Sequence, residues 1–380
     1  MTLKKPLKFE FIYEDLKERI LMDEFKEAGK LPPEYILTET YKCSRPTLQK
    51  ALRMLINEKI VSTIQGSGTF INPQPAEIET TREFSTKTNG QSLYGLIFPN
   101  LGPGFIFKTI TDSIAESISH LNASLIWGGY ISPSASNLQQ QIKDICDSYI
   151  ELGIKGVFFA PFEYNEYSDE ANTFIVNSFT NANIPIVLVD ADITQYPQRS
   201  SYDLVSLDHV HAGYTITSHM IEKGAKKILF LTLPYSKNSY KLRLMGFHEA
   251  LFDHGIPPTE AYMVTCKPEH TEEVAEVLKK YKPDGIITLI DRAAVSLITT
   301  LRKLGISVPH DILIGSFDDL GYLFDMSIST IRQPLEQIGK AAVKMMIERE
   351  KDLSLSSRTV TYSGELKEGV SSNPDSPISL

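Results

Sequence analysis

The sequence predicts an α/β protein of two units: a small helical N-terminal unit with a β-hairpin, and a larger unit of parallel, doubly wound sheets. The chain has 380 residues, whereas single domains cluster at roughly 100–150 residues. Residues 1–72 carry three amphipathic helical patterns followed by two short β-rich runs. From residue 93 onward, apolar β-rich runs alternate with helical stretches, as in parallel sheets covered by helices.

The three helical patterns of the first unit are short and close together. Apolar residues recur at helical spacing from Phe9 to Phe25, and a second helix is expected from Glu34 to Tyr41. A third is expected from Arg45 to Asn57, because Ser44 stands at the N-cap position and Pro46 is tolerated in a first turn. The apolar face of this third helix consists of Leu48, Ala51, Leu52 and Leu55.

A hairpin is expected after the third helix, because residues 60–64 and 69–71 are β-rich and flank Gln65-Gly66-Ser67-Gly68. Three helices and a hairpin in this order make a winged helix-turn-helix. The polar and basic start of such a third helix can enter a DNA major groove, while the wing contacts the adjacent backbone.

The segment LPPEYILTETYKCSRPTLQKALRMLINEKIVSTIQGSGTFI resembles the DNA-binding domain of the GntR family of bacterial transcription regulators. The resemblance spans residues 9–72 and rests on LP-x-E, SR-x-T, AL-xx-L and QGSGTF in that order. It implies DNA contacts from the start of the third helix and from the wing tip, namely Ser44, Arg45, Thr47, Gln49, Lys50, Gln65 and Gly66.

Two positions depart from the family pattern, because Tyr35 and Gln49 stand where many members have arginine. Gln49 can bond an adenine edge instead, so we expect an operator that differs from the family's commonest form. The alternative interpretation of Arg45, Gln49 and Lys50 is a solvated helix face. The neighbouring SR-x-T turn and QGSG wing favour DNA contact.

Composition and charge agree with a soluble DNA-binding protein. The chain is 42% hydrophobic and 22% charged, without an 18-residue apolar run or a signal peptide, so we expect a cytoplasmic protein without a membrane span. Cys43, Cys146 and Cys266 form neither a disulfide framework nor a zinc pattern. Residues 1–72 hold 12 basic and 10 acidic residues, whereas the remaining 308 hold 26 and 37. The two parts therefore face different partners.

Residues 73–92 are rich in Pro, Thr, Ser and charge and predict a linker. In the second unit, ligands are expected where parallel strands end. The residues that follow the β runs are carboxylates and aromatics: Asn100 to Phe105, Trp127, Phe162, Asp190, Asp208, Asp291 and Asp318. This mixture suits a neutral polyol such as a sugar. The alternative interpretation is capping or ion pairing at strand ends for Asp190, Arg243 and Asp318, and core packing for Phe105, Phe162 and Trp127.

The ordered segments YGLIFPN, PIVLVDAD, VSLDHVHAG, KLRLMGF, LRKLGISVPHDILIGSFDD and STIRQPLEQIGKAA are similar to the effector domain of LacI/GalR repressors and sugar-binding periplasmic proteins. The similarity covers residues 93–370. It implies a type I periplasmic-binding-protein-like domain whose two lobes, joined by three crossings, clamp a sugar. Carried onto this sequence, Phe105 would stack on the ring, while Asp190, Arg243 and Asp318 would bond hydroxyls. Gln333 would sit at the last crossing.

Two departures, Asp291 after Ile290 where Asn-Asp is usual and Ala191 where some ribose binders have arginine, imply an altered sugar specificity. The combination of domains resembles arabinose-repressor-type regulators. It implies a repressor of a carbohydrate-utilisation operon, with operator DNA and a pentose, hexose or phosphorylated sugar as partners, acting as a homodimer.

Two other function classes remain as alternatives: a sugar receptor without regulatory coupling, and a sugar-processing enzyme. No nucleophile with a credible base is present. Asp208-His209-x-His211 has unsuitable spacing for joint metal ligation. We therefore expect no catalysis, cofactor or metal, and a disordered tail over residues 371–380. The sequence leaves open which sugar binds and whether it releases or recruits the repressor.

Overall fold

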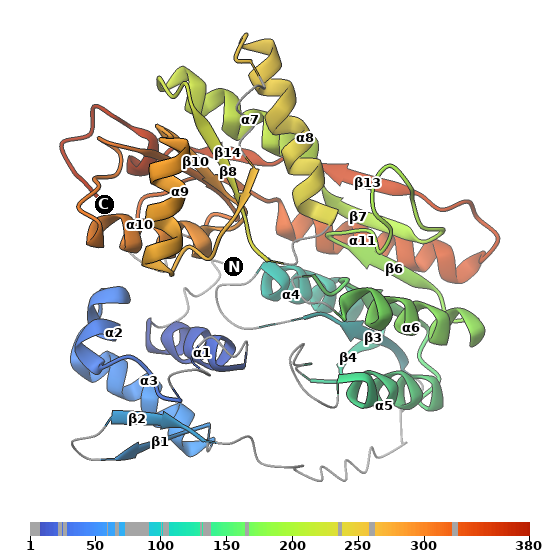
Figure 1. Cartoon of the computed structure of the whole chain (residues 1–380). Coiled ribbons are helices and arrows are strands. Elements are labelled where there is room, and N and C mark those ends of the chain that lie inside the picture. The colour runs from blue at the N-terminus through green and yellow to red at the C-terminus, as the bar shows by residue number, and fades with distance from the viewer. Residues whose placement is uncertain are drawn as a thin grey trace.

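The protein consists of an N-terminal head followed by two lobes (Figure 1). The computed structural model describes residues 8–21, 25, 29–58, 60–64, 68–72, 91–99, 101, 106–129, 131, 138–163, 167–234, 238–257, 263–320 and 326–380. Gln65 and Gly66 of the expected wing tip, the expected stacking residue Phe105 and most of the expected linker lie outside these residues. No helix among the described residues is long and apolar enough to span a bilayer.

The head, defined as the described part of residues 8–72, is a winged helix-turn-helix. It comprises α1 (Lys8–Leu21), α2 (Glu34–Thr40), α3 (Arg45–Asn57), and the antiparallel strands β1 (Val61–Ile64) and β2 (Gly68–Ile71). The expected bounds of the third helix are confirmed. Leu48, Ala51, Leu52 and Leu55 are at most 4% exposed. Because burial of this apolar face holds α3 against the rest of the head, its polar side is left to solvent.

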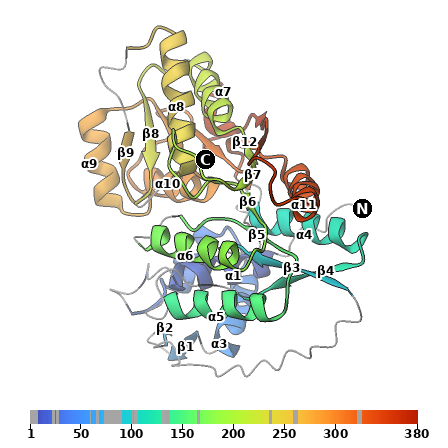
Figure 2. The same cartoon turned by 90° about the vertical axis from the view of Figure 1, so that its right-hand side faces the viewer.

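The first lobe is a six-stranded, fully parallel sheet in the order β13-β7-β6-β5-β3-β4. Its strands are β3 (Ser92–Ile97), β4 (Ala123–Trp127), β5 (Gly156–Phe159), β6 (Ile186–Val189), β7 (Asp203–Leu207) and β13 (Thr359–Tyr362). Its helices are α4 (Ile106–Ser119), α5 (Leu138–Glu151), α6 (Ser168–Asn181) and α11 (Leu335–Lys351). Alternate strand residues pack with α4 and α11 on one face and with α5 and α6 on the other (Figure 2).

The second lobe has the sheet order β14-β12-β11-β10-β8-β9, parallel except for β14. Its strands are β8 (Ile228–Thr232), β9 (Met263–Thr265), β10 (Gly285–Thr288), β11 (Leu313–Phe317), β12 (Ser329–Arg332) and β14 (Glu365–Lys367). Its helices are α7 (His209–Glu222), α8 (Asn238–Asp253), α9 (Thr271–Tyr281) and α10 (Asp291–Lys303). Helices α7 and α8 cover one face, and α9 and α10 cover the other. The expected two lobes of doubly wound parallel sheets are thereby confirmed.

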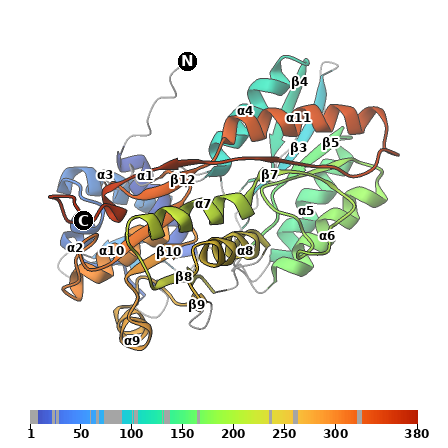
Figure 3. The same ribbon diagram turned by 90° about the horizontal axis from the view of Figure 1, so that it is seen from above.

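Three crossings join the lobes (Figure 3). The chain crosses between β7 and α7, between β12 and α11, and between β13 and β14. The crossings touch, because the Asp208 amide donates to the Tyr362 carbonyl at 2.8 Å. A Cβ at Gly364 would lie 2.4 Å from Ile331 Cγ2. Gln333 lies at the second crossing, so its expected place at the last one is wrong: the chain crosses once more after β13.

The tail differs from the expectation of disorder over residues 371–380. Val370–Ser372 form a 3₁₀ turn, and the buried Ser371 donates its hydroxyl to the Ile314 carbonyl at 2.6 Å. The backbone ends with the Leu380 amide donating to the Val308 carbonyl at 2.8 Å. The tail is polar because its serines satisfy buried backbone groups of the second lobe.

Helices α7 and α8 approach closely at two glycines. A Cβ added to Gly213 would lie 2.0 Å from the Arg243 carbonyl oxygen, and one added to Gly246 would lie 1.9 Å from the Val210 carbonyl oxygen. Both carbonyl oxygens belong to the backbone, so neither can rotate away from an added Cβ as a side chain could. The contact fixes the position of Arg243 on α8.

We expect Gly213→Ala to lower the free energy of unfolding by at least about 1–3 kcal/mol, because the added methyl group forces α7 and α8 apart. Urea denaturation measures this change. Met245→Ala, which shortens a partly exposed side chain on α8, is the control and should have a much smaller effect. Equal stability of Gly213→Ala and the parent chain would contradict the close approach.

Candidate functional site

The start of α3 is built as an exposed, capped helix terminus. Ser44 has extended backbone dihedrals, and its hydroxyl accepts from the Thr47 amide at 3.4 Å. The Ser44 and Thr47 hydroxyl oxygens are 2.7 Å apart. This cap holds the first turn in place, and the positive end of the helix dipole there is a favourable environment for a phosphate.

Basic and polar side chains surround this terminus. The Arg45 side chain is 74% exposed, and its Nε donates to Glu34 Oε2 of α2 at 2.9 Å. Such an exposed pair stabilises little, so DNA can displace Glu34. Lys50 Nζ lies 3.5 Å from the Phe9 ring centroid, Gln49 is half-buried, and Tyr35 is exposed. Of the predicted DNA-contacting residues at this terminus, Ser44, Arg45 and Lys50 are exposed, whereas Thr47 and Gln49 are half-buried.

The second candidate site, named here the interlobe cluster, consists of Glu163, Asp190, His209, Arg243, Asp318 and Gln333. Asp190 follows β6 of the first lobe, and Asp318 follows β11 of the second. Both have positive φ, 73° and 105°. Backbone of this kind is rare for residues other than glycine and gathers at ligand sites. The charges of Arg243 and Asp318 both act on Asp190, so carboxyl ends of strands from both sheets meet here.

Arg243 lies at the centre of the interlobe cluster and is only 4% exposed. Its NH1 donates to the Leu289 carbonyl at 2.5 Å, and its Nε donates to His209 Nδ1 at 3.3 Å. Its Cζ stands 4.2 Å from the Phe317 ring centroid. Two hydrogen bonds and a ring contact orient this guanidinium.

His209 links Arg243 to the first lobe. Because Nδ1 accepts from Arg243, the ring proton is on Nε2, which donates to the Asp190 carbonyl at 3.1 Å. Burial, and then the positive charge of Arg243, lower the pKa of His209 to about 3. His209 is therefore a neutral bridge between lobes.

The carboxyl groups of the interlobe cluster are hard to ionise. Burial, followed by the like charge of Glu163, raises the pKa of Asp190 to about 7, although Arg243 opposes the rise. Burial also raises the pKa of Asp318, against the effects of Arg243 and of a hydrogen bond from Gln333. Such groups can both donate to and accept from hydroxyls of a ligand.

Gln333 adds an unused acceptor. Its Nε2 donates to Asp318 Oδ1 at 2.7 Å. Its Oε1 is buried and has no hydrogen-bond partner among the described residues. A buried amide oxygen without a partner costs free energy, which a ligand hydroxyl at this position would recover.

One contact that the sequence did not indicate closes the lobes over this cluster. Glu163 of the first lobe accepts from the Ser239 amide at 3.3 Å and from the Ser239 hydroxyl at 2.9 Å. Ser239 belongs to α8 of the second lobe. Neither residue stands in a distinctive motif, and their pairing depends on how the lobes face each other.

Other strand-end residues have structural roles. Asp291 is fully buried and accepts from the Leu320 amide at 2.6 Å and the Thr330 hydroxyl at 2.9 Å. Asp208 caps α7 by accepting from the His211 amide at 3.0 Å. Phe162 belongs to the core of the first lobe, while Trp127 is exposed at 39%. Asp208 is therefore a helix cap and Phe162 a core residue, whereas Asp291 anchors neighbouring segments.

The histidines that suggested a metal are separated. His209 bonds within the interlobe cluster, whereas His211 is exposed and its Nδ1 lies 3.5 Å from the Thr215 hydroxyl of α7. Among the described ranges, no group of three His, Cys, Asp or Glu side chains could hold a metal ion. A surface groove of about 560 Å³ lies elsewhere, along α11 and β13, and includes none of the predicted effector residues.

Comparison with known proteins agrees with the division into a head and a two-lobed unit. Residues 8–71 match the family described as bacterial regulatory proteins, gntR family. Residues 217–372 match the periplasmic binding protein-like domain. These matches confirm both resemblances expected from the sequence.

Similar proteins cover most of the chain. The arabinose metabolism transcriptional repressor of Geobacillus stearothermophilus is 27% identical over 351 residues, which are 88% of this chain and 90% of that protein. The transcription regulator CcpA of Lactococcus lactis aligns over 74% of this chain and 99% of its own, with TM-score 0.62 and 20% identity. A LacI family regulator from Enterococcus faecium with bound ribose covers the same shares, with TM-score 0.58 and 18% identity. At these identities the two structures show the fold alone.

We expect the stability of the chain relative to Asp190→Asn to fall as pH rises from about 4 to about 7. The folded chain holds the Asp190 proton up to its raised pKa of about 7, whereas the unfolded chain releases it near about 3.9. Urea midpoints of both chains at intervals across this range measure the difference. A difference that does not vary with pH would contradict the raised pKa.

Proposed function

We propose that this chain, which joins a GntR-type DNA-binding head to a periplasmic-binding-protein-like domain, is a transcriptional repressor of a carbohydrate-utilisation operon, controlled by a sugar bound between its lobes. The observation that carries the proposal is the presence, in one chain, of an exposed and capped α3 terminus and a buried interlobe cluster of hydroxyl-binding groups. The similarity to arabinose metabolism repressors along most of the chain supports it.

The proposed division of labour assigns residues 1–72 to DNA, 73–92 to a linker and 93–370 to the effector. On the DNA side, Ser44, Arg45, Thr47, Gln49 and Lys50 contact the groove, and Gln65 and Gly66 the backbone. Asp190, Arg243, Asp318 and Gln333 bond sugar hydroxyls, and Phe105 stacks on the ring. The chain acts in the cytoplasm as a homodimer over half-sites about 34 Å apart. It needs no catalysis or cofactor.

The charge of the interlobe cluster indicates the class of sugar. Among the described residues of the interlobe cluster, three acidic side chains, Glu163, Asp190 and Asp318, accompany one cation, Arg243, which is already bonded to His209 and Leu289. A phosphate would add negative charge next to these acidic groups, two of which, Asp190 and Asp318, burial already makes hard to ionise. We therefore favour a neutral pentose or hexose over a phosphorylated sugar. Its entry requires the Glu163–Ser239 contact to open.

The experiment that tests the function separates the two sites. We expect Arg45→Ala to weaken binding to a duplex selected from a random library by about 5- to 150-fold, because a base or phosphate contact is lost. Its sugar binding should not change. Arg53→Ala, an exposed cation further along α3, is the control. Electrophoretic titration measures the affinity.

Arg243→Lys should weaken sugar binding and leave DNA binding unchanged, the reverse of Arg45→Ala. The lysine keeps the charge but loses the planar fork that reaches Leu289 and His209, so sugar binding weakens while DNA binding without sugar persists. If the wild-type chain selected no DNA sequence, or if Arg45→Ala bound its duplex as tightly as the parent, the proposed function would be wrong.

A thermal-shift screen tests the effector class. The compounds to screen are arabinose, ribose, xylulose, glucose and their phosphate esters. At least one neutral sugar should raise the melting temperature, because a ligand that binds only the folded state stabilises it. The esters should have little effect. Stabilisation by an ester but not by its parent sugar would overturn the assignment to neutral sugars.

A further inference from the structure

The head contacts the second lobe through an ion pair between helices far apart in the sequence. Asp15 of α1 and Arg292 of α10 approach to 3.1 Å between Oδ1 and NH1. Their side chains are 3% and 21% exposed. Because water is largely excluded, this pair is less screened than a surface salt bridge. Loss of one partner would leave a buried charge.

Asp15 is also a central group inside the head. Tyr41 directly follows α2, and its hydroxyl donates to Asp15 Oδ2. Arg19 donates to the same hydroxyl at 3.1 Å and lies 3.7 Å from Asp15. One carboxylate therefore joins α1, the end of α2 and α10. A shift of α10 would therefore displace α1 and the end of α2 together.

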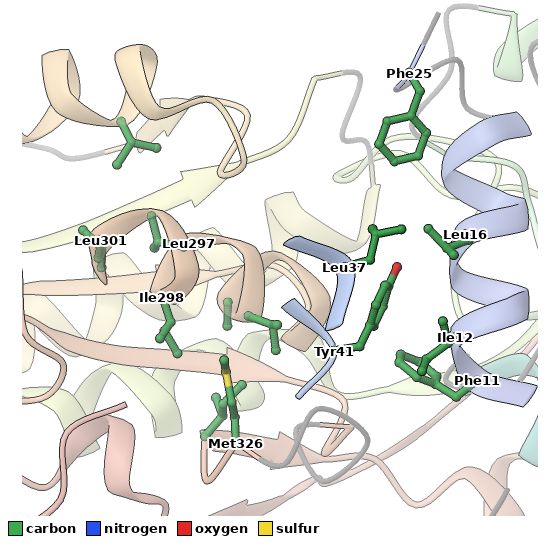
Figure 4. Packing of buried hydrophobic residues seen from close by; sticks show 14 of the residues in the cluster. Phe11, Ile12, Leu16, Phe25, Leu37, Tyr41, Leu297, Ile298, Leu301 and Met326 are labelled. Atoms are coloured by element: carbon green, nitrogen blue, oxygen red, sulfur yellow. The ribbon is translucent and has the colours of Figure 1, made fainter. Parts of the chain in front are cut away.

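Apolar packing surrounds the ion pair. The buried side chains of the head and those of the α9–α10 face of the second lobe form one continuous hydrophobic cluster. In Figure 4, Leu37 and Tyr41 lie between the labelled side chains of α1 and those of α10, with Met326 beside them. The head is thus seated on the lobe and is not merely tethered to it.

The other end of this connection reaches the interlobe cluster. Arg292 directly follows Asp291, the first residue of α10. Asp291 accepts from the Leu320 amide, in the segment after β11, and from the Thr330 hydroxyl of β12. That segment begins with Asp318, which is bonded to Gln333 at the second crossing. A single residue, Asp319, thus separates Asp318 of the interlobe cluster from Leu320, whose amide bonds Asp291 at the start of α10.

Seating the head does not cover its DNA-contacting face. Arg45 is 74% exposed at the start of α3, while the ion pair involves α1. The contact therefore sets the direction in which α3 points, and does not hide it.

We propose that the Asp15–Arg292 pair and the apolar cluster around it form an intramolecular docking interface through which the lobes set the orientation of the head on DNA. This inference rests on the proposed function. A sugar that rearranges Asp318 shifts the segment anchored to Asp291, and α10 passes the shift to α1. The coupling residue Arg292 touches neither sugar nor DNA.

The test compares Arg292→Glu with Arg302→Glu in the full chain. The two variants make the same charge change on α10, but Arg302 is exposed and carries no described contact with the head. Arabinose should change the duplex affinity of the wild-type chain and of Arg302→Glu by about 5- to 150-fold, the usual range of allosteric coupling. For Arg292→Glu the change should fall below about two-fold, with unaltered arabinose affinity. A full response in Arg292→Glu would overturn the proposal.

Amide hydrogen exchange tests the docking itself, without reference to DNA or sugar. Residues 8–21 and 291–303 should exchange faster in Arg292→Glu than in wild type and Arg302→Glu, because seating protects them. Arg292→Gln provides a milder variant if Arg292→Glu does not fold. Unchanged exchange in a folded Arg292 variant would overturn the proposal. If arabinose left wild-type DNA binding unchanged, the proposed function for that sugar would fail, and exchange alone would decide the interface.

Discussion

The guanidinium of Arg243 is the group on which the arrangement between the lobes depends. Asp190 and Asp318 come from different sheets, and whenever both are ionised their like charges would keep the two strand ends apart. The buried cation between them offsets that repulsion. Its position in turn depends on Gly213, because only a residue without a side chain lets α7 meet the Arg243 backbone. The packing of α7 against α8 therefore positions the charge that holds the two lobes together.

Features that depend on neighbouring residues were predictable from the sequence. Ser44 and Pro46 mark the start of α3, and its apolar face follows from 3.6-residue spacing. Strand ends place Asp190 and Asp318 each at the edge of its own sheet, and the resemblance to two-lobed binding proteins predicted that these two edges face each other. Nothing in these rules says which strand-end carboxylate faces a ligand. Asp208 and Asp291 satisfy the same pattern, yet serve as a cap and a loop anchor.

Features that depend on distant partners were not predictable. Strands β13 and β14 are short, partly exposed and without an apolar run, so they could not be recognised as strands, and Gln333 was wrongly placed at the last of the three crossings. The tail serines are polar by sequence, but Ser371 and Ser372 are buried against the second lobe. The closing contact of Glu163 and the Asp15–Arg292 pair likewise arise only when separate units meet.

The route of the chain through the lobes has a consequence for synthesis. Helix α11 covers one face of the first sheet, and β13 forms its edge, yet both are translated after five of the six strands of the second sheet. While a ribosome is still making the second lobe, Val187 and Val205 of the first lack the cover that α11 later supplies. The apolar surface of the first lobe therefore stays exposed, and can bind chaperones, until nearly the whole polypeptide has emerged.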